Sequence, residues 1–125
     1  MKSRDGLIRL KRFHVEEKRR QVAQIETMIA EFERMAKELN DQILAEQERS
    51  GIHDAGHFAY PTFAKAASQR RDNLVASANE LKEQLAGAKA EFDEAVAELE
   101  KVEAIAERDQ ANDKHAHKAG AEARA

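Results

Sequence analysis

Residues 74–106 read LVASANELKEQLAGAKAEFDEAVAELEKVEAIA, and apolar side chains recur in this stretch at alternating intervals of four and three residues. The recurring positions are Leu74, Ala78, Leu81, Leu85, Ala88, Phe92, Ala95, Leu99, Val102 and Ala106. This heptad spacing is typical of a long helix that packs along a partner helix. It predicts a helix over about residues 62–109.

A second heptad series precedes this one. Its members are Ile8, Val15, Val22, Ile29, Ala36 and Ile43, with Ile25, Phe32 and Leu39 at the alternate position. In the first two heptads the alternate position holds Lys11 and Lys18, so the apolar seam is weaker there. The series predicts a helix over about residues 5–49.

The stretch between the two series, SGIHDAGHFAYP over residues 50–61, breaks the pattern. Gly51 suits the end of one helix and Pro61 suits the start of the next. The sequence therefore predicts an all-α fold in which two long helices form an antiparallel coiled-coil hairpin. The hairpin would be a single domain over residues 1–110, with a tip loop at about 50–61 and a flexible polar tail at 110–125.

The charge distribution agrees with a chain that folds back on itself. Residues 1–20 carry eight basic and three acidic side chains, whereas residues 72–109 carry four basic and eleven acidic ones. A hairpin in which paired residue numbers add to about 110 places basic residues 9–20 beside acidic residues 91–103, and pairs Ile29 with Leu81. A neighbouring register with sums near 117 stays open. A parallel homodimer also satisfies the heptads, but it would set the two basic segments side by side.

Composition argues against an enzyme. Of the 125 residues, 24 are Ala, none is Trp or Cys, and 36% are charged, so the chain cannot fill a thick core around a buried cleft. We find no phosphate-binding loop and no nucleophile motif, and His53 and His57 flank Gly56 in the break rather than sharing a helical face. We expect no catalysis, metal or cofactor. No run of 18 apolar residues occurs, so we expect a cytoplasmic protein.

Two groups of residues are candidates for binding a partner, which is typical of an adaptor. The tip group is Ile52, Phe58, Tyr60, Phe63, Arg70 and Arg71. The terminal group is Leu7, Arg9, Leu10, Lys11 and Phe13. For the tip, the alternative is that an aromatic ring caps the seam near Ile43 and that Arg71 partly covers the seam. For the basic segment Arg9–Arg20, the alternative is nucleic-acid binding, which acidic residues directly opposite make unfavourable.

Some stretches resemble a known family. They are Leu7–Phe13, Val15–Arg20, Gly51-Ile52, the segment His57–Ala66 (HFAYPTFAKA), and Arg70–Leu74 (RRDNL). Together they resemble the FliJ family of flagellar type III export proteins, in its alphaproteobacterial form, over about residues 5–110. The Phe-Ala-Tyr-Pro stretch and the Arg-Arg-Asp-Asn-Leu after it are the most specific of these.

The resemblance implies a two-helix antiparallel coiled coil, similar to the stalk helices of the rotary ATPase γ subunit. It implies a chaperone-like adaptor at the centre of the hexameric export ATPase FliI, which also contacts the cytoplasmic domain of the export gate FlhA and export chaperones. Membrane association would then be peripheral, through these partners. The alternatives are a generic coiled-coil scaffold, the stalk protein of an injectisome, or a nucleic-acid-binding hairpin.

Overall fold

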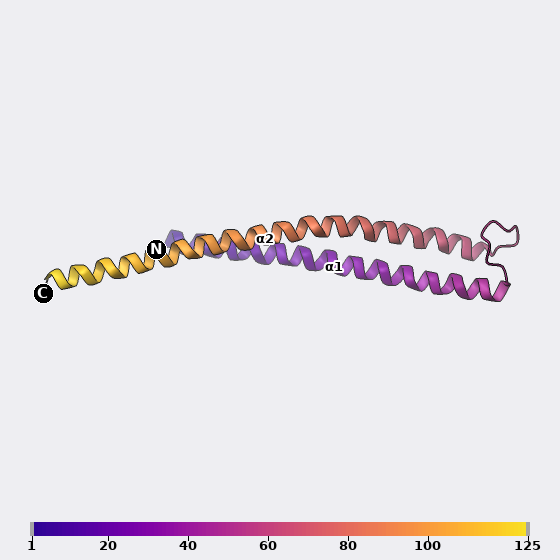
Figure 1. Ribbon diagram of the computed structural model, residues 1–125, viewed down its shortest axis with the longest axis horizontal. Coiled ribbons are helices and arrows are strands. Elements are labelled where there is room, and N and C mark those ends of the chain that lie inside the picture. The colour runs from indigo at the N-terminus through magenta and orange to yellow at the C-terminus, as the bar shows by residue number, and fades with distance from the viewer. Residues whose placement is uncertain (1, 125) are drawn as a thin grey trace. The chain divides into compact units, whose positions relative to one another are not determined.

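A computed structural model describes the backbone of residues 2–124 and the side chains of residues 3–120. It consists of two α-helices, α1 over Lys2–Ser50 and α2 over Thr62–Arg124, and residues 2–124 contain no strand. Figure 1 shows the loop that leaves the end of α1 and leads into α2. The predicted all-α fold with two long helices is confirmed.

The residues of the chain group into two compact units, and the single hairpin domain over residues 1–110 stays a prediction. One unit is Val22–Gly87, and the other joins Met1–Gln21 to Ala88–Ala125. Each unit contains a stretch of α1 and an antiparallel stretch of α2. Since a residue in a two-helix pair contacts only the stretch directly opposite, such a pair has no central core that would gather all its residues into one unit.

The core of the Val22–Gly87 unit follows the predicted heptads. Its buried side chains are Ile29, Ala36 and Ile43 on α1 and Ala64, Ala67, Ala78 and Leu81 on α2. Ile43 packs with Ala64 and Ala67, and Leu39 and Tyr60 cover this cluster. Here a large side chain thus faces two alanines, so the two backbones can lie close together at this point with little space left between them.

In the other unit, alanines and long cations make up much of the seam. Ala88, Ala95 and Ala106 of α2 are buried, and Arg4, Lys11 and Lys18 of α1 are half-buried at heptad spacing. Long basic side chains can lay their apolar stems over such small residues and keep their charges near water. This explains why lysines are tolerated at the two weak positions of the first heptad series.

Each of these seam cations meets a carboxylate from α2. The ion pairs are Arg4–Asp109 at 2.8 Å, Lys18–Glu91 at 3.0 Å, Lys11–Glu98 at 3.9 Å and, beside the seam, Arg12–Glu103 at 4.0 Å. The predicted juxtaposition of basic residues 9–20 with acidic residues 91–103 is therefore confirmed. Exposed pairs of this kind contribute about 1 kcal/mol or less each to the stability of the fold. Their main effect is therefore to favour the antiparallel arrangement of the helices over a parallel one.

Two of these four ion pairs agree with the register near 110. The residue numbers of Lys18–Glu91 and Lys11–Glu98 each add to 109. In the Val22–Gly87 unit, Arg71 Nη1 donates to Asn40 Oδ1 at 2.8 Å, a pair whose numbers add to 111. The sums of the other interhelical pairs lie between the two registers, at 113 for Arg4–Asp109 and 115 for Arg12–Glu103 and Glu33–Lys82.

Cysteines at Ile29 and Leu81 test this register. Both side chains are buried on facing helices of one unit, and the chain has no cysteine of its own. We expect the double variant to crosslink within one chain under mild oxidation, which gel mobility without reductant will show. Crosslinking only between chains would instead support the parallel homodimer.

The end of α1 depends on one glycine. Gly51 has φ of 74°, and its N–H donates to the carbonyl oxygen of Gln47 at 2.8 Å, which closes the last turn. Loop contacts then hold residues 54–60, including Gly56 N–H to Asp54 Oδ1 at 2.9 Å. At the far end of the loop, the carbonyl of Pro61 accepts from Lys65 N–H at 3.1 Å and starts α2.

Two glycine-to-alanine changes should have opposite effects on stability. Gly51→Ala forces a Cβ into the left-handed region and should destabilise the fold by about 1 kcal/mol. Gly87→Ala lies within α2, where an added Cβ meets no atom within 4 Å, and should stabilise it by about 0.5–1 kcal/mol. Thermal unfolding followed by circular dichroism will separate them. Equal shifts would contradict the role of Gly51 in ending α1.

Helix α2 does not end near residue 109, as the sequence predicted, but continues to Arg124. Residues 110–124 contain no proline and five alanines, including Ala111, Ala116 and Ala119, so intrinsic propensity favours the helix. The side chains of residues 110–120 are all exposed. The predicted end of the helix near residue 109 is therefore wrong, because the helix propensity of the alanines outweighs the polarity of their neighbours. The flexibility of the tail stays a prediction.

Candidate docking surfaces

The tip loop presents one aromatic ring to solvent. Phe58 is 97% exposed, and its ring stacks on His57 with centroids 4.7 Å apart. Backbone hydrogen bonds on either side, His57 N–H to the Asp54 carbonyl and Tyr60 N–H to the His57 carbonyl, both 3.0 Å, hold this part of the loop. A ring held in place and exposed has little conformational entropy to lose on binding, which suits a docking residue.

Tyr60 has a different environment from Phe58. It packs on the cluster of Ile43, Ala64 and Ala67, and its hydroxyl accepts a hydrogen bond from Gln47 Nε2 at 2.9 Å. Of the two alternatives for the tip aromatics, Tyr60 therefore takes the structural one and caps the seam. We therefore leave Tyr60 out of the tip surface, and its role in partner binding stays a prediction.

The remaining tip residues divide in the same way. Phe63 is 52% exposed, whereas Ile52 is half-buried. Arg71 is half-buried and bonds to Asn40, and it also pairs with Asp72 at 3.2 Å, so it covers the seam instead of extending toward solvent. Arg70 is exposed and lines a hollow of about 200 Å³ with α1 residues that include Met35 and Leu39. Of the predicted tip residues, Phe58, Phe63 and Arg70 are exposed, and we call these three the tip surface. Binding of a partner by any of the predicted tip residues stays a prediction.

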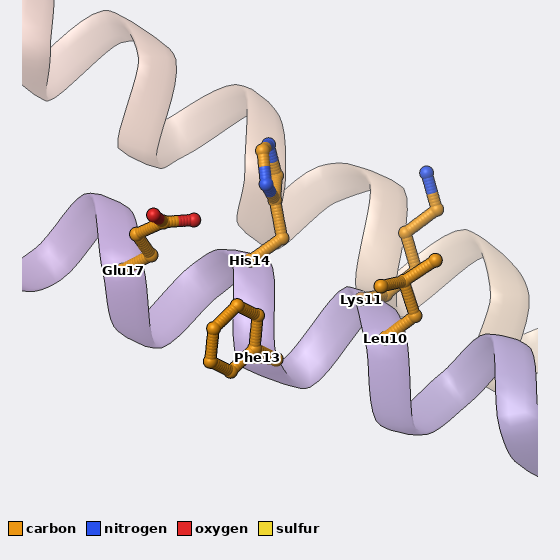
Figure 2. A pocket seen from close by; sticks show the side chains of 5 residues that line it. All are labelled: Leu10, Lys11, Phe13, His14 and Glu17. Atoms are coloured by element: carbon orange, nitrogen blue, oxygen red, sulfur yellow. The ribbon is translucent and has the colours of Figure 1, made fainter.

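The terminal group forms an exposed apolar face on α1. Leu7, Leu10 and Phe13 are 43%, 62% and 60% exposed. Leu10 and Phe13 line a hollow of about 290 Å³. Figure 2 shows that Lys11 extends toward α2, whereas Phe13 lies over α1 itself. Arg9 is exposed, but Lys11 is half-buried and paired with Glu98. We therefore assign Lys11 to the seam.

Two residues of this hollow were not predicted from the sequence. His14 and Glu17 line it together with Leu10 and Phe13. Phe13, His14 and Glu17 lie three, four and seven residues after Leu10, so all four residues lie on neighbouring turns of one helical face. The same helical spacing, applied to the side of the first predicted helix that faces away from the seam, predicts the positions of His14 and Glu17.

No charged or polar side chain is buried in the part of the chain that the structure describes. No three His, Asp or Glu side chains gather there as they would to hold a metal ion, and His53 and His57 are exposed. The hydrogen bond and charge of Glu31, together with Glu38, raise the pKa of Arg34, but these groups lie on an exposed helix face. Among residues 2–124, neither helix has an apolar stretch long enough to cross a membrane.

The fold and these surfaces define a two-helix antiparallel coiled-coil protein with exposed apolar side chains in both units. No protein-family model, no curated protein and no solved structure matches the sequence.

Proposed function

We propose that the chain is a non-enzymatic, chaperone-like adaptor of a flagellar type III protein export apparatus, which links the export ATPase hexamer to the export gate. The observation that carries the proposal is the position of Phe58. This ring is 97% exposed on a hydrogen-bonded loop, and it belongs to the Phe-Ala-Tyr-Pro stretch that resembles the FliJ family most specifically.

The two docking surfaces support an adaptor role because they belong to different units of the chain. We assign the tip surface, with Phe58 at its centre, to the cytoplasmic domain of the export gate FlhA. The terminal surface, Leu7, Leu10 and Phe13, is then available to a second partner, either the ATPase FliI or an export chaperone. Aromatic side chains that enter a partner's pocket supply most of the binding energy in many interfaces.

In this role the chain needs no catalytic group of its own, since the ATPase would hydrolyse the nucleotide. The adaptor contributes a scaffold of two helices and side chains that select partners. It would lie at the cytoplasmic face of the membrane through those partners.

Deletion of the gene tests this proposal. We expect loss of flagellar filaments while other secreted proteins are exported normally, with recovery by the wild-type gene and poor recovery by Phe58→Ala. The matched control is Met28→Ala, which removes an exposed side chain on α1 away from the tip and should restore filaments fully. Normal filaments in the deletion strain would contradict the proposal, and selective loss of injectisome secretion would support the alternative role as an injectisome stalk protein.

A further inference from the structure

The turn of the tip loop that carries Phe58 is held by His57. The N–H of His57 donates to the carbonyl of Asp54, and its carbonyl accepts from the N–H of Tyr60, both at 3.0 Å. Its ring adds a third hydrogen bond, because Nδ1 accepts from the N–H of Ala59 at 3.0 Å. This last bond joins the residues on either side of Phe58, and it therefore limits the backbone angles that Phe58 can adopt.

The ring of His57 also supports the ring of Phe58 directly. The two rings are stacked, with their centroids 4.7 Å apart and their planes inclined by 23°. An exposed aromatic side chain that stacks on a neighbour in its own loop has fewer orientations to lose when a partner binds it. His57 thus restrains both the backbone and the side chain of Phe58.

The bond from Ala59 determines which protonation state of His57 supports the turn. A ring nitrogen accepts a hydrogen bond only through its lone pair, so Nδ1 carries no proton and the neutral ring carries its proton on Nε2. When a second proton binds at Nδ1, both ring nitrogens become donors. The N–H of Ala59 then faces another N–H, and the bond breaks. A charged ring can still stack on Phe58, since an aromatic face attracts a cation, but the stack does not restore the link to Ala59.

The charged and titratable groups around the loop do not hold the ring of His57. Asp54 accepts from the N–H of Gly56 at 2.9 Å, and the hydroxyl of Tyr60 accepts from Gln47. Among the side chains that the structure describes, none forms an ion pair or a side-chain hydrogen bond with His57. The groups considered are His53, Asp54 and Tyr60 in the loop, Glu46, Glu48 and Arg49 at the end of α1, and Lys65 at the start of α2.

We propose that His57 is the positioning residue of the tip surface, and that its neutral ring holds Phe58 in the conformation that a partner binds. Uptake of a proton at Nδ1 breaks the bond from Ala59 and frees the backbone around Phe58. A partner must then order this backbone when it binds, so the tip binds more weakly in acid. This inference rests on the proposed function for the identity of the partner, and it deepens that function by naming a residue and a condition that regulate binding.

The first test uses the full chain alone, labelled with a stable nitrogen isotope. NMR signals of the His57 ring should show the proton on Nε2 at about pH 8 and protons on both nitrogens at about pH 5, the range over which imidazoles ordinarily titrate. The temperature dependence of the Ala59 amide shift should be that of a hydrogen-bonded amide at the higher pH and of a free amide at the lower. A neutral ring with its proton on Nδ1, or an Ala59 amide that stays bonded in acid, would overturn the proposal.

The second test measures binding of the export gate domain over the same pH range by fluorescence anisotropy. The wild-type chain should bind about fivefold more weakly at the lower pH, which corresponds to the loss of one hydrogen bond. His57→Asn is the decisive variant, because an asparagine side chain can accept from the N–H two residues farther on and does not titrate in this range. Its affinity should change by less than about twofold with pH.

This comparison also removes any titration of the gate domain itself, because both chains meet the same domain. His53→Asn is the matched control, since it removes the other histidine of the loop and should keep the wild-type profile. Circular dichroism will verify that the helices of each variant are intact. The same pH profile for the wild-type chain and His57→Asn would overturn the proposal.

Failure of this proposal and failure of the proposed function give different results. If the gate domain binds at no pH but the Ala59 bond is lost in acid, the positioning role of His57 stands and the assigned partner is wrong. If the gate domain binds with the same profile to the wild-type chain and to His57→Asn, the partner stands and His57 does not regulate its binding.

Discussion

Replacing Ile43 with alanine should lower the free energy of unfolding by about 2–4 kcal/mol, the largest loss that we expect from a single truncation. Ile43 is 3% exposed and packs with Ala64 and Ala67, which are 0% and 5% exposed. Because these neighbours are alanines, no side chain nearby is long enough to fill the space that Ile43 leaves. Thermal unfolding should show a midpoint lower by about 10 °C or more.

The matched control is the next residue, Leu44, which is 52% exposed. Leu44→Ala removes a side chain of the same size from the outer face of α1, and its cost should stay below about 1 kcal/mol. If the two variants melt at the same temperature, Ile43 is not in the seam and the helices do not pair in the register near 110.

The second large effect concerns the tip. Phe58→Ala should leave the thermal midpoint unchanged and weaken binding to the export gate domain about tenfold or more, because the ring is 97% exposed. Isothermal titration with the purified domain will measure this loss. Normal binding by Phe58→Ala would remove the tip from the proposed interface.

Tyr60 provides the matched contrast two residues away. Tyr60→Ala should cost about 2 kcal/mol of stability, since it uncovers the Ile43 cluster and removes the hydrogen bond from Gln47. Tyr60→Phe keeps the ring and should cost about 1 kcal/mol or less. A Tyr60→Ala variant that melts normally but binds poorly would return Tyr60 to the docking surface.

The seams could be predicted from the sequence because a two-helix pair repeats one local rule along its whole length. Apolar residues spaced by three and four must face the partner, so Ile29 and Leu81 were predicted as core residues and are buried. The break at Gly51 was equally clear, since a residue with positive φ at a helix end is most often glycine.

The heptad pattern could not predict that Phe58 is exposed and that Tyr60 packs on the seam. Both are aromatic, and they lie two residues apart in an irregular loop, where no periodicity tells which ring turns inward. The difference depends on the path of the loop after Gly51 and on the position of Gln47 across the turn. No local pattern in the sequence encodes such a contact.

Opposing local preferences explain the remaining differences. Residues after Asp109 are polar enough to suggest a loose tail, yet their alanines favour the helix that α2 continues to form. Lys11 and Lys18 look like defects of the seam when α1 is considered by itself. Their presence is explained by the ion pairs that they form with Glu98 and Glu91 of α2.

Affinity purification of the tagged full chain from the cytoplasm of cells that are assembling flagella, followed by mass spectrometry, decides whether the chain is an export adaptor. We expect the flagellar export ATPase to be recovered in stoichiometric amount with the wild-type chain. The Leu10→Ser, Phe13→Ser variant or the Phe58→Ala variant should lose at least one partner, and Met28→Ala should lose none. Recovery of nucleic acid or of an unrelated scaffold, with no export ATPase or gate protein, would contradict the adaptor role.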